Sequence, residues 1–449
     1  MTTSNTPSDT LPERTTSIPD VGVLGRWVGW AAACSILLQI TTITCAVIAA
    51  RLLGIADFGR FSIAQSTAVM FLGVAGSGLG ITATRYTARL EKTDPRRLGA
   101  ILGVAHLVAL VAAVVAGALL LLFSRSIAIH AYGRLDLEPC LRLTTPYLFF
   151  SALNAYQMGA LVGLGAFRQM ATVTALQFFV GVALTTSLTV SAGVNGAIIG
   201  ASGAALANWL HCHRVLATML RSRGIRLTYS TSSHDLRVLW EFALPAAVSS
   251  VLGTACMWLV GAMLVKQTNN VNEAAIFVAA GTLRQVIVFA PAIVQKVFAV
   301  PLSQMFGRIN QADYRRFHFR QAAWNLLAAA AIAGVVWTGR GLVMRLFGRQ
   351  FSDDGNVCAF VVVFAVLEAY AISAYQAIPA TGRMWWQVAV IVLWCGILTS
   401  GAKEFVTAGG ASGLAKAYCL AWLSSAVAYT LVSKYLLRNA PVVPAVVNA

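Results

Sequence analysis

The sequence predicts an all-α integral membrane protein, and two features of its composition predict this class. Of its 449 residues, 58% are hydrophobic and only 11% are charged, whereas ordinary soluble domains carry about 25% charged residues. The apolar residues also gather in blocks of about 18 to 26, each long enough to cross a bilayer as a helix. Because such a chain lacks the polar atoms to cover a water-facing surface, a soluble enzyme is excluded.

Twelve apolar blocks follow one another along the chain, so we expect twelve transmembrane helices. Their predicted cores are 26–50, 61–83, 98–123, 143–166, 170–191, 194–217, 242–265, 275–302, 321–339, 356–380, 384–401 and 412–435. An even number of spans places both termini on one side of the membrane. Connections on the side of the N-terminus carry 20 Lys and Arg against 11 on the other side, which predicts that both termini are cytoplasmic.

An internal repeat divides the chain into two halves. The segment from Arg125 to Arg134 (RSIAIHAYGR) matches that from Arg340 to Arg349 (RGLVMRLFGR) at both end arginines and at the glycine. At nearly the same offset, Leu153-Asn-Ala-Tyr156 aligns with Leu367-Glu-Ala-Tyr370. The repeat predicts two six-helix lobes related by a pseudo-twofold axis along the membrane normal. Transporters with such repeats bind their cargo at the repeat interface and rock open to either side.

These features together predict the following domain organisation. Residues 1–21 are a disordered cytoplasmic tail, 22–220 the N-terminal six-helix lobe, 221–240 a cytoplasmic linker, 241–438 the C-terminal six-helix lobe and 439–449 a C-terminal tail.

Charged side chains in mid-span are the first candidates for function, because each costs at least about 2.5 to 3.5 kcal/mol to insert. Arg284 and Lys296 lie in the predicted eighth span and Glu368 in the tenth. Arg284 could hold a phosphate through its planar fork or form a structural ion pair with Glu368. Lys296 could contact a ligand or reach the cytoplasmic surface. Glu368 could accept a coupling proton or sit over a cation.

Further candidates lie at the ends of spans and opposite Glu368 in the repeat. Arg51 ends the first span on the outer side and Arg85 ends the second on the inner side, where they could draw in an anionic substrate or reflect ordinary loop charge. Asn154 is the repeat counterpart of Glu368 and Gln157 lies close to it. We expect these residues to complete the substrate-binding set.

Several chemistries are excluded by the motifs that the sequence lacks. It contains no GxxxxGK[ST] phosphate loop and no HExxH helix, so we expect neither ATP hydrolysis by that route nor a zinc site, no catalytic residues, and no cofactor. The net charge of +17 is attributed to the orientation of the loops rather than to nucleic acid.

Four short motifs resemble those of a known family. They are Ala50-Arg-Leu-Leu-Gly-Ile-Ala-Asp-Phe-Gly59, Gly80-Ile-Thr-Ala-Thr-Arg-Tyr-Thr-Ala-Arg89, Leu244-Pro-Ala-Ala-Val-Ser-Ser250 and Arg345-Leu-Phe-Gly-Arg-Gln-Phe351. In this order and spacing, from about Gly25 to Arg438, the chain resembles the polysaccharide-transporter flippases. These are the O-antigen and exopolysaccharide exporters of the MATE-like multidrug/oligosaccharidyl-lipid/polysaccharide superfamily.

The resemblance implies a transporter rather than an enzyme. It implies a V-shaped pair of lobes that moves an undecaprenyl-diphosphate-linked oligosaccharide to the outer face of a bacterial plasma membrane, with membrane lipids and a polysaccharide polymerase complex as partners. It also implies a cleft lined with basic residues, for which Arg284, Lys296, Arg85 and Arg51 are the candidates. The alternatives are a MATE-like small-molecule or cation antiporter and a membrane lipid-linked glycosyltransferase.

Overall fold

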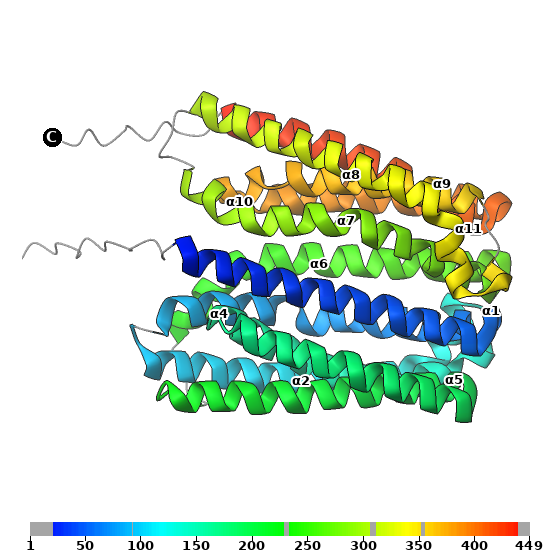
Figure 1. The fold of residues 1–449 in the computed structure, drawn as a ribbon, viewed down its shortest axis with the longest axis horizontal. Coiled ribbons are helices and arrows are strands. Elements are labelled where there is room, and N and C mark those ends of the chain that lie inside the picture. Colours follow the sequence, from blue (N-terminus) through cyan, green and yellow to red (C-terminus); the bar gives the residue numbers. More distant parts are fainter. Residues whose placement is uncertain (1–20, 92, 229–232, 306–310, 352–354, 439–449) are drawn as a thin grey trace, which may run out of the picture.

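The described residues of the protein form a bundle of long helices with no β-strand among them (Figure 1). The structure is a computed structural model that describes residues 21–91, 93–228, 233–305, 311–351 and 355–438. At some helical positions within these ranges, among them Arg85 and Lys296, only the backbone is described. The expected tails at 1–20 and 439–449 lie outside the described residues.

The helices follow in the order α1 to α11 with three short helical turns between them. Their bounds are α1 Val21–Leu90, α2 Pro95–Ser126, η1 Ile127–Ala131, η2 Leu135–Leu137, α3 Glu138–Leu143, α4 Thr145–Gly163, α5 Phe167–Ser222, α6 Ser233–Thr268, α7 Val271–Met305, α8 Gln311–Phe347, η3 Arg349–Phe351, α9 Gly355–Ala374, α10 Ala377–Thr381 and α11 Trp385–Arg438. Because α6 starts at Ser233, residues 233–240 of the expected linker 221–240 are helical.

Local chemistry explains where α2 begins. Asp94 is its N-cap, and the Asp94 carboxylate accepts a hydrogen bond of 3.0 Å from the backbone N–H of Arg97. Pro95 occupies the first helical position, where a missing N–H costs nothing and the fixed φ suits the helix.

Eight segments among the described residues are long and apolar enough to cross a membrane. Three of them are 42, 56 and 54 residues long, about twice or more what one crossing needs. They lie in α1, α5 and α11, and each of these helices contains a kink with non-helical torsion angles, at Gly54, at Ala192–Gly193 and at Gly410. The all-helical membrane class is therefore confirmed, while twelve spans in two lobes stay a prediction.

Left-handed backbone positions recur along the chain at a nearly constant spacing. Gly54 and Asn269 both have positive φ, and the same sequence separation relates Gly133 to Gly348. A slightly longer separation relates Gly165 to Gly382 and Gly193 to Gly410. All four of these glycines also have positive φ. Positive φ is readily adopted by glycine and sometimes by asparagine. The turns of the chain thus recur with nearly the period of the sequence repeat.

The close contact between α1 and α4 depends on two glycines of α4, Gly159 and Gly163. A Cβ on Gly159 would overlap the carbonyl oxygen of Gly80, and one on Gly163 would lie 2.6 Å from the Thr84 carbonyl oxygen. The Thr84 hydroxyl donates to the Gly159 carbonyl at 2.9 Å. Because these glycines have no side chain, α1 and α4 can approach closely, as helices with small residues do in membranes.

The bundle is held by cores within each half and by a core that joins the halves. One apolar cluster consists only of residues between Cys34 and Ile225, and another only of residues between Ala371 and Leu436. Two further clusters combine residues of both halves, for example Phe58 with Phe347 and Phe351. Helices α2, α4 and α5 pack around α1, and α7, α8 and α11 pack around α9, while α1 also contacts α6 and α7 (Figure 1).

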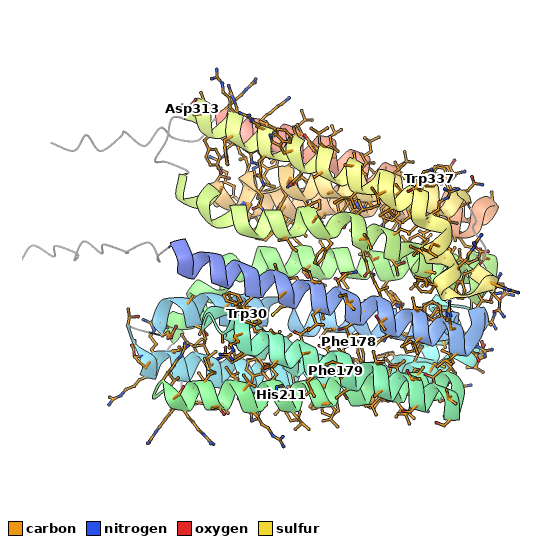
Figure 2. The ribbon with its side chains drawn as sticks, viewed as in Figure 1. Trp30, Phe178, Phe179, His211, Asp313 and Trp337 are labelled. Carbon is orange, nitrogen blue, oxygen red and sulfur yellow. The ribbon has the colours of Figure 1, made fainter. Side chains whose placement is uncertain are left out.

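Large apolar side chains cover much of the outer surface of the bundle (Figure 2). Phe179 on α5 is 67% exposed, Leu122 on α2 76% and Val335 on α8 73%. Exposed apolar surface on this scale would be unfavourable in water but matches the hydrocarbon of a bilayer. The exposed apolar side chains therefore make the outer surface of the bundle suited to contact with lipid.

Candidate functional site

An ion pair between α7 and α9 lies within the C-terminal half. Arg284 Nε donates to Glu368 Oε2 and Arg284 Nη2 donates to Glu368 Oε1, both at 2.5 Å. This two-point geometry is the strongest that a guanidinium and a carboxylate can form. The sequence alternative of a structural ion pair is therefore realised in this state of the protein.

The two partners of the pair differ in their access to the surroundings. The Glu368 side chain is 5% exposed, whereas that of Arg284 is 31% exposed. The carboxylate is thus enclosed by protein, and it binds a guanidinium that is partly exposed. Among the described residues, Nη1 of Arg284 takes no part in the fork, so the pair leaves this nitrogen for a further acceptor.

An aromatic stack borders the ion pair on the same helix faces. Tyr418 of α11 lies between Phe277 and Phe364, with ring centroids 5.6 and 5.2 Å apart and the planes nearly parallel. Phe277 precedes Arg284 by seven positions and Phe364 precedes Glu368 by four, so each lies above its charged partner along one face. The stack fixes α7, α9 and α11 relative to one another and thereby holds the pair in register.

A polar bridge next to Arg284 connects the two halves of the chain. Gln39 Nε2 of α1 donates to Gln285 Oε1 of α7 at 2.6 Å. Because Gln285 directly follows Arg284, this hydrogen bond links α1 to the part of α7 that carries the cation. The sequence reasoning did not select Gln39, since an isolated glutamine in an apolar block gives no signal of its distant partner.

Asn154 and Gln157 belong to a different helix group from the ion pair. They lie on α4, which packs against α1, α2 and α5. Gln157 is fully buried, its Nε2 lies 3.4 Å from His213 Nδ1, and its Oε1 has no hydrogen-bond partner among the described residues. Nearby, His106 Nδ1 lies 2.6 Å from the Tyr156 hydroxyl. The structure thus separates these two predicted residues from Arg284 and Glu368.

The bend of α1 at Gly54 lies at the opposite end of the bundle from the start of α1 and the end of α11 (Figure 1), and Arg51 precedes this bend by three residues. Arg51 Nε donates to the Leu346 carbonyl at 2.6 Å, and Nη2 lies 3.3 Å from the Arg345 carbonyl. Its charge therefore compensates the negative end of α8. For Lys296 and Arg85, which were also expected at the site, the structure describes the helical backbone but not the side chains.

The end of the bundle that contains Arg51, which we call the distal end, is closed by further contacts between the two halves. Lys266 Nζ donates to the His130 carbonyl at 2.8 Å, and Trp258 Nε1 donates to the Thr67 hydroxyl at 3.1 Å. The backbone N–H of Ile55 donates to Gln350 Oε1 at 3.1 Å.

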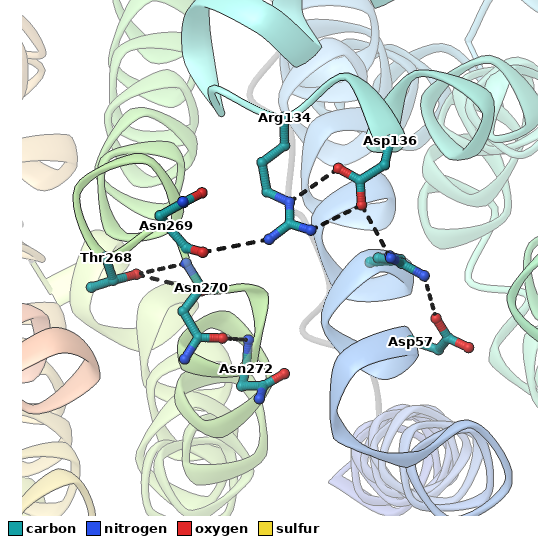
Figure 3. A network of polar contacts seen from close by, with 8 residues as sticks. Asp57, Arg134, Asp136, Thr268, Asn269, Asn270 and Asn272 are labelled. Carbon is teal, nitrogen blue, oxygen red and sulfur yellow. Dashed lines mark hydrogen bonds and ion pairs between the residues drawn. The ribbon is translucent and has the colours of Figure 1, made fainter.

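A network of ion pairs continues this closure (Figure 3). Arg134 donates to both oxygens of Asp136 and contacts the Asn269 carbonyl, and Asp136 is bonded to Arg60, which also pairs with Asp57. The hydrogen bonds from Arg134 and the nearby guanidinium of Arg60 hold the pKa of the Asp136 carboxyl below its usual value. The network ties the connection after α2 to the turn between α6 and α7.

Solved structures show the class of protein that this fold defines. An inward-facing multidrug resistance MATE family transporter of the MOP superfamily superposes with a TM-score of 0.77 at 16% identity, over 89% of this chain and 94% of that one. An outward-facing conformation of such a transporter gives a TM-score of 0.70 at 14% identity, over 93% and 95%. The chain therefore has the fold of the MATE transporters.

Sequence comparison defines the family within that fold. The family model of polysaccharide biosynthesis proteins matches residues 24–305, well over half of the chain, and the chain belongs to this family. The EPS I polysaccharide export inner membrane protein EpsE of Ralstonia nicotianae (strain ATCC BAA-1114 / GMI1000) is 23% identical over 370 residues, 79% of this chain and 81% of EpsE. The relatives are transport and export proteins, and the expected family membership is confirmed.

Proposed function

We propose that the protein moves an undecaprenyl-diphosphate-linked oligosaccharide from the cytoplasmic to the outer leaflet of a bacterial plasma membrane by alternating access. The observation that carries this proposal is a partly exposed arginine, Arg284, held by an enclosed carboxylate inside a helix bundle of the MATE fold. Membership of the polysaccharide biosynthesis family and the export function named for EpsE support a sugar-bearing cargo.

The twelve expected spans and two six-helix lobes are part of this proposal. Kinks in α1, α5 and α11 support the division of each long helix into two spans. Left-handed turns that recur with nearly the period of the sequence repeat support two equivalent halves. The start of α1 and the end of α11 lie at one end of the bundle (Figure 1), and the excess of Lys and Arg in connections at that end favours the cytoplasm.

Arg284 is proposed to bind the diphosphate of the cargo. The guanidinium is neutralised by Glu368, which lowers the cost of a cation within the membrane. A diphosphate would approach through the Nη1 side and share or replace the carboxylate. Glu368 is proposed as the site of proton or cation coupling, because loss of its negative charge would remove the partner that competes with the cargo for Arg284. The sugar is proposed to travel in the space between the lobes while the lipid tail stays in the bilayer.

The membrane potential favours movement in the proposed direction. A diphosphate with about two negative charges gains roughly 4 to 5 kcal/mol per 100 mV on leaving a negative cytoplasm, at about 2.3 kcal/mol per charge. Export therefore needs no nucleotide-driven motor.

The described conformation is proposed to be open toward the cytoplasm. Contacts between the halves at the distal end, including Arg51 with Leu346 and Lys266 with His130, support a closed outer side. The higher TM-score with the inward-facing transporter, 0.77 against 0.70, agrees with this assignment.

Deletion of the gene tests the proposal. We expect lipid-linked oligosaccharide to accumulate in the cytoplasmic leaflet of the deletion strain, and a plasmid copy to restore export. Accumulation in the outer leaflet would instead place the protein after translocation, as for a polymerase or glycosyltransferase. Unchanged glycolipid combined with loss of drug efflux would favour the cation antiporter.

A further inference from the structure

A cavity at the distal end is lined by three arginines. It has a volume of about 530 Å³ and lies where α1 bends at Gly54 and where α8 passes through Gly348 into η3. Arg51 lines one wall, and Arg345 and Arg349 line the other. The rings of Phe347 and Phe351, each 1% exposed, support the cavity from the protein interior.

The lining of this cavity is strongly biased in charge. Arg51, Arg345 and Arg349 contribute three cationic groups, and among the described residues no Asp or Glu lines the cavity; Asp353 and Asp354 lie outside the described residues. Within the described residues none of the three takes part in an ion pair. Arg51 donates Nε and Nη2 to backbone carbonyls, which leaves its Nη1 outside those bonds. Like charges gathered at one concave site repel one another, and an anion relieves that repulsion.

We propose that this cavity is a binding site for a phosphate-bearing anion, and that the bound anion holds the distal end closed. Arginine forks match the oxygens of phosphate in shape and charge. The anion would lie between Arg51 of α1 and Arg345 and Arg349 of the α8–η3 segment. Because these walls belong to opposite halves of the chain, a ligand that contacts both stabilises the arrangement in which they meet.

The location gives the site a regulatory role that rests on the proposed function. If the distal end faces outward, the phosphate comes from the outer leaflet, either as the diphosphate of the delivered carrier lipid or as an anionic phospholipid headgroup. Both sources present the same chemistry to the arginines. An anion that accumulates outside would then delay reopening of the outer side, so the product would restrain its own export. The two equilibria are linked. The factor by which the bound anion disfavours opening therefore equals the factor by which opening weakens anion binding.

Binding of inorganic pyrophosphate to the full-length purified protein tests the site directly. We would measure it by calorimetry at constant ionic strength in nanodiscs of phosphatidylcholine, for the wild type and for R345Q/R349Q. The matched control is R125Q/K403Q, which removes two exposed positive charges near the same end of the bundle but outside the cavity. Thermal unfolding and gel filtration would establish that each variant is folded.

We expect R345Q/R349Q to bind pyrophosphate about tenfold or more weakly, because two charge-assisted contacts are lost, and the control to bind like the wild type. Equal binding by R345Q/R349Q and wild type, an equal loss in the control, or no binding by the wild type would overturn the site. Repetition in nanodiscs with phosphatidylglycerol, and separately with undecaprenyl diphosphate, identifies the source as the lipid that competes with pyrophosphate.

The same preparations separate this inference from the proposed function. A wild type that moves glycolipid and binds pyrophosphate no more tightly than R345Q/R349Q would refute the anion site alone. A wild type whose pyrophosphate binding depends on Arg345 and Arg349 but which moves no glycolipid would refute the proposed function alone.

Discussion

The guanidinium of Arg284 and the carboxylate of Glu368 meet through two hydrogen bonds of 2.5 Å between α7 and α9. The enclosed partner is the carboxylate, at 5% exposure against 31% for the arginine. Removal of one partner therefore has different consequences from removal of both, and this difference separates the structural role of the pair from its role in transport.

R284Q alone is expected to lower the stability of the protein. It leaves Glu368 as an enclosed, unpaired carboxylate, and breaking such a buried pair costs about 3 to 5 kcal/mol. R284Q/E368Q removes both charges and should recover most of that loss. Thermal unfolding in detergent measures the effect. If R284Q and the double variant unfolded at the same temperature, the carboxylate would not depend on the arginine for its burial.

Cross-linking at the distal end is expected to stop transport. H130C/K266C replaces two exposed residues that meet across the halves, where Lys266 Nζ lies 2.8 Å from the His130 carbonyl oxygen. A short, reducible bis-thiol reagent should join the two cysteines, block movement of cargo and release it again after reduction. The single variants H130C and K266C, treated in the same way, serve as controls. Transport at the full rate by cross-linked protein would mean that this end does not open.

Substitution of Gly410 is expected to destabilise the kink in α11. Gly410 has φ +51°, and a Cβ at this position would overlap Glu273 Oε2, which accepts a 2.7 Å hydrogen bond from the Ala411 N–H. G410A should cost about 1 to 3 kcal/mol through backbone strain and displacement of Glu273. G334A is the control, because no atom lies within 4 Å of its added Cβ; there the exchange should be neutral or stabilising. Equal unfolding temperatures for G410A and G334A would contradict this role.

The Asp136 network is expected to give a pH-dependent contribution to stability. Its carboxyl has a lowered pKa in the folded protein, so its contribution is complete above the ordinary pKa of aspartate and is lost as the pH falls through the lower folded value. The wild type should exceed D136N by about 0.5 to 1 kcal/mol at neutral pH, and the difference should shrink below about pH 4. D313N, which removes an exposed carboxylate at the start of α8 outside this network, serves as the reference variant. A wild-type advantage that stayed constant down to pH 2 would argue against the ion pairs.

Composition and block length were sufficient to predict the membrane class, because apolar segments of this length have few alternatives to a transmembrane helix. The repeat was also visible in the sequence at Arg125–Arg134 and Arg340–Arg349. The kinks were harder to place: Gly54 and Gly410 stand among many glycines of the chain, and only the backbone torsion angles distinguish a bend from a close helix contact such as that at Gly159.

Depth along a span selected Arg284 and Glu368, and the structure brings these two together. Depth along a span could not reveal Gln39 as the neighbour of Gln285, because the two glutamines are 246 residues apart in the sequence. The cavity with Arg345 and Arg349 was missed for the same reason. Its other wall comes from Arg51, far earlier in the chain, and loop arginines alone are indistinguishable from ordinary surface charge.

Movement of an undecaprenyl-diphosphate-linked oligosaccharide by purified protein in liposomes tests the role of Arg284 most directly. The rate at which the glycolipid reaches the opposite leaflet would be compared between wild type and R284Q/E368Q, the variant in which no buried charge is left unpaired. We expect movement by the wild type and a rate for the double variant at the level of protein-free liposomes. Movement at the wild-type rate by folded R284Q/E368Q would contradict a diphosphate contact at Arg284.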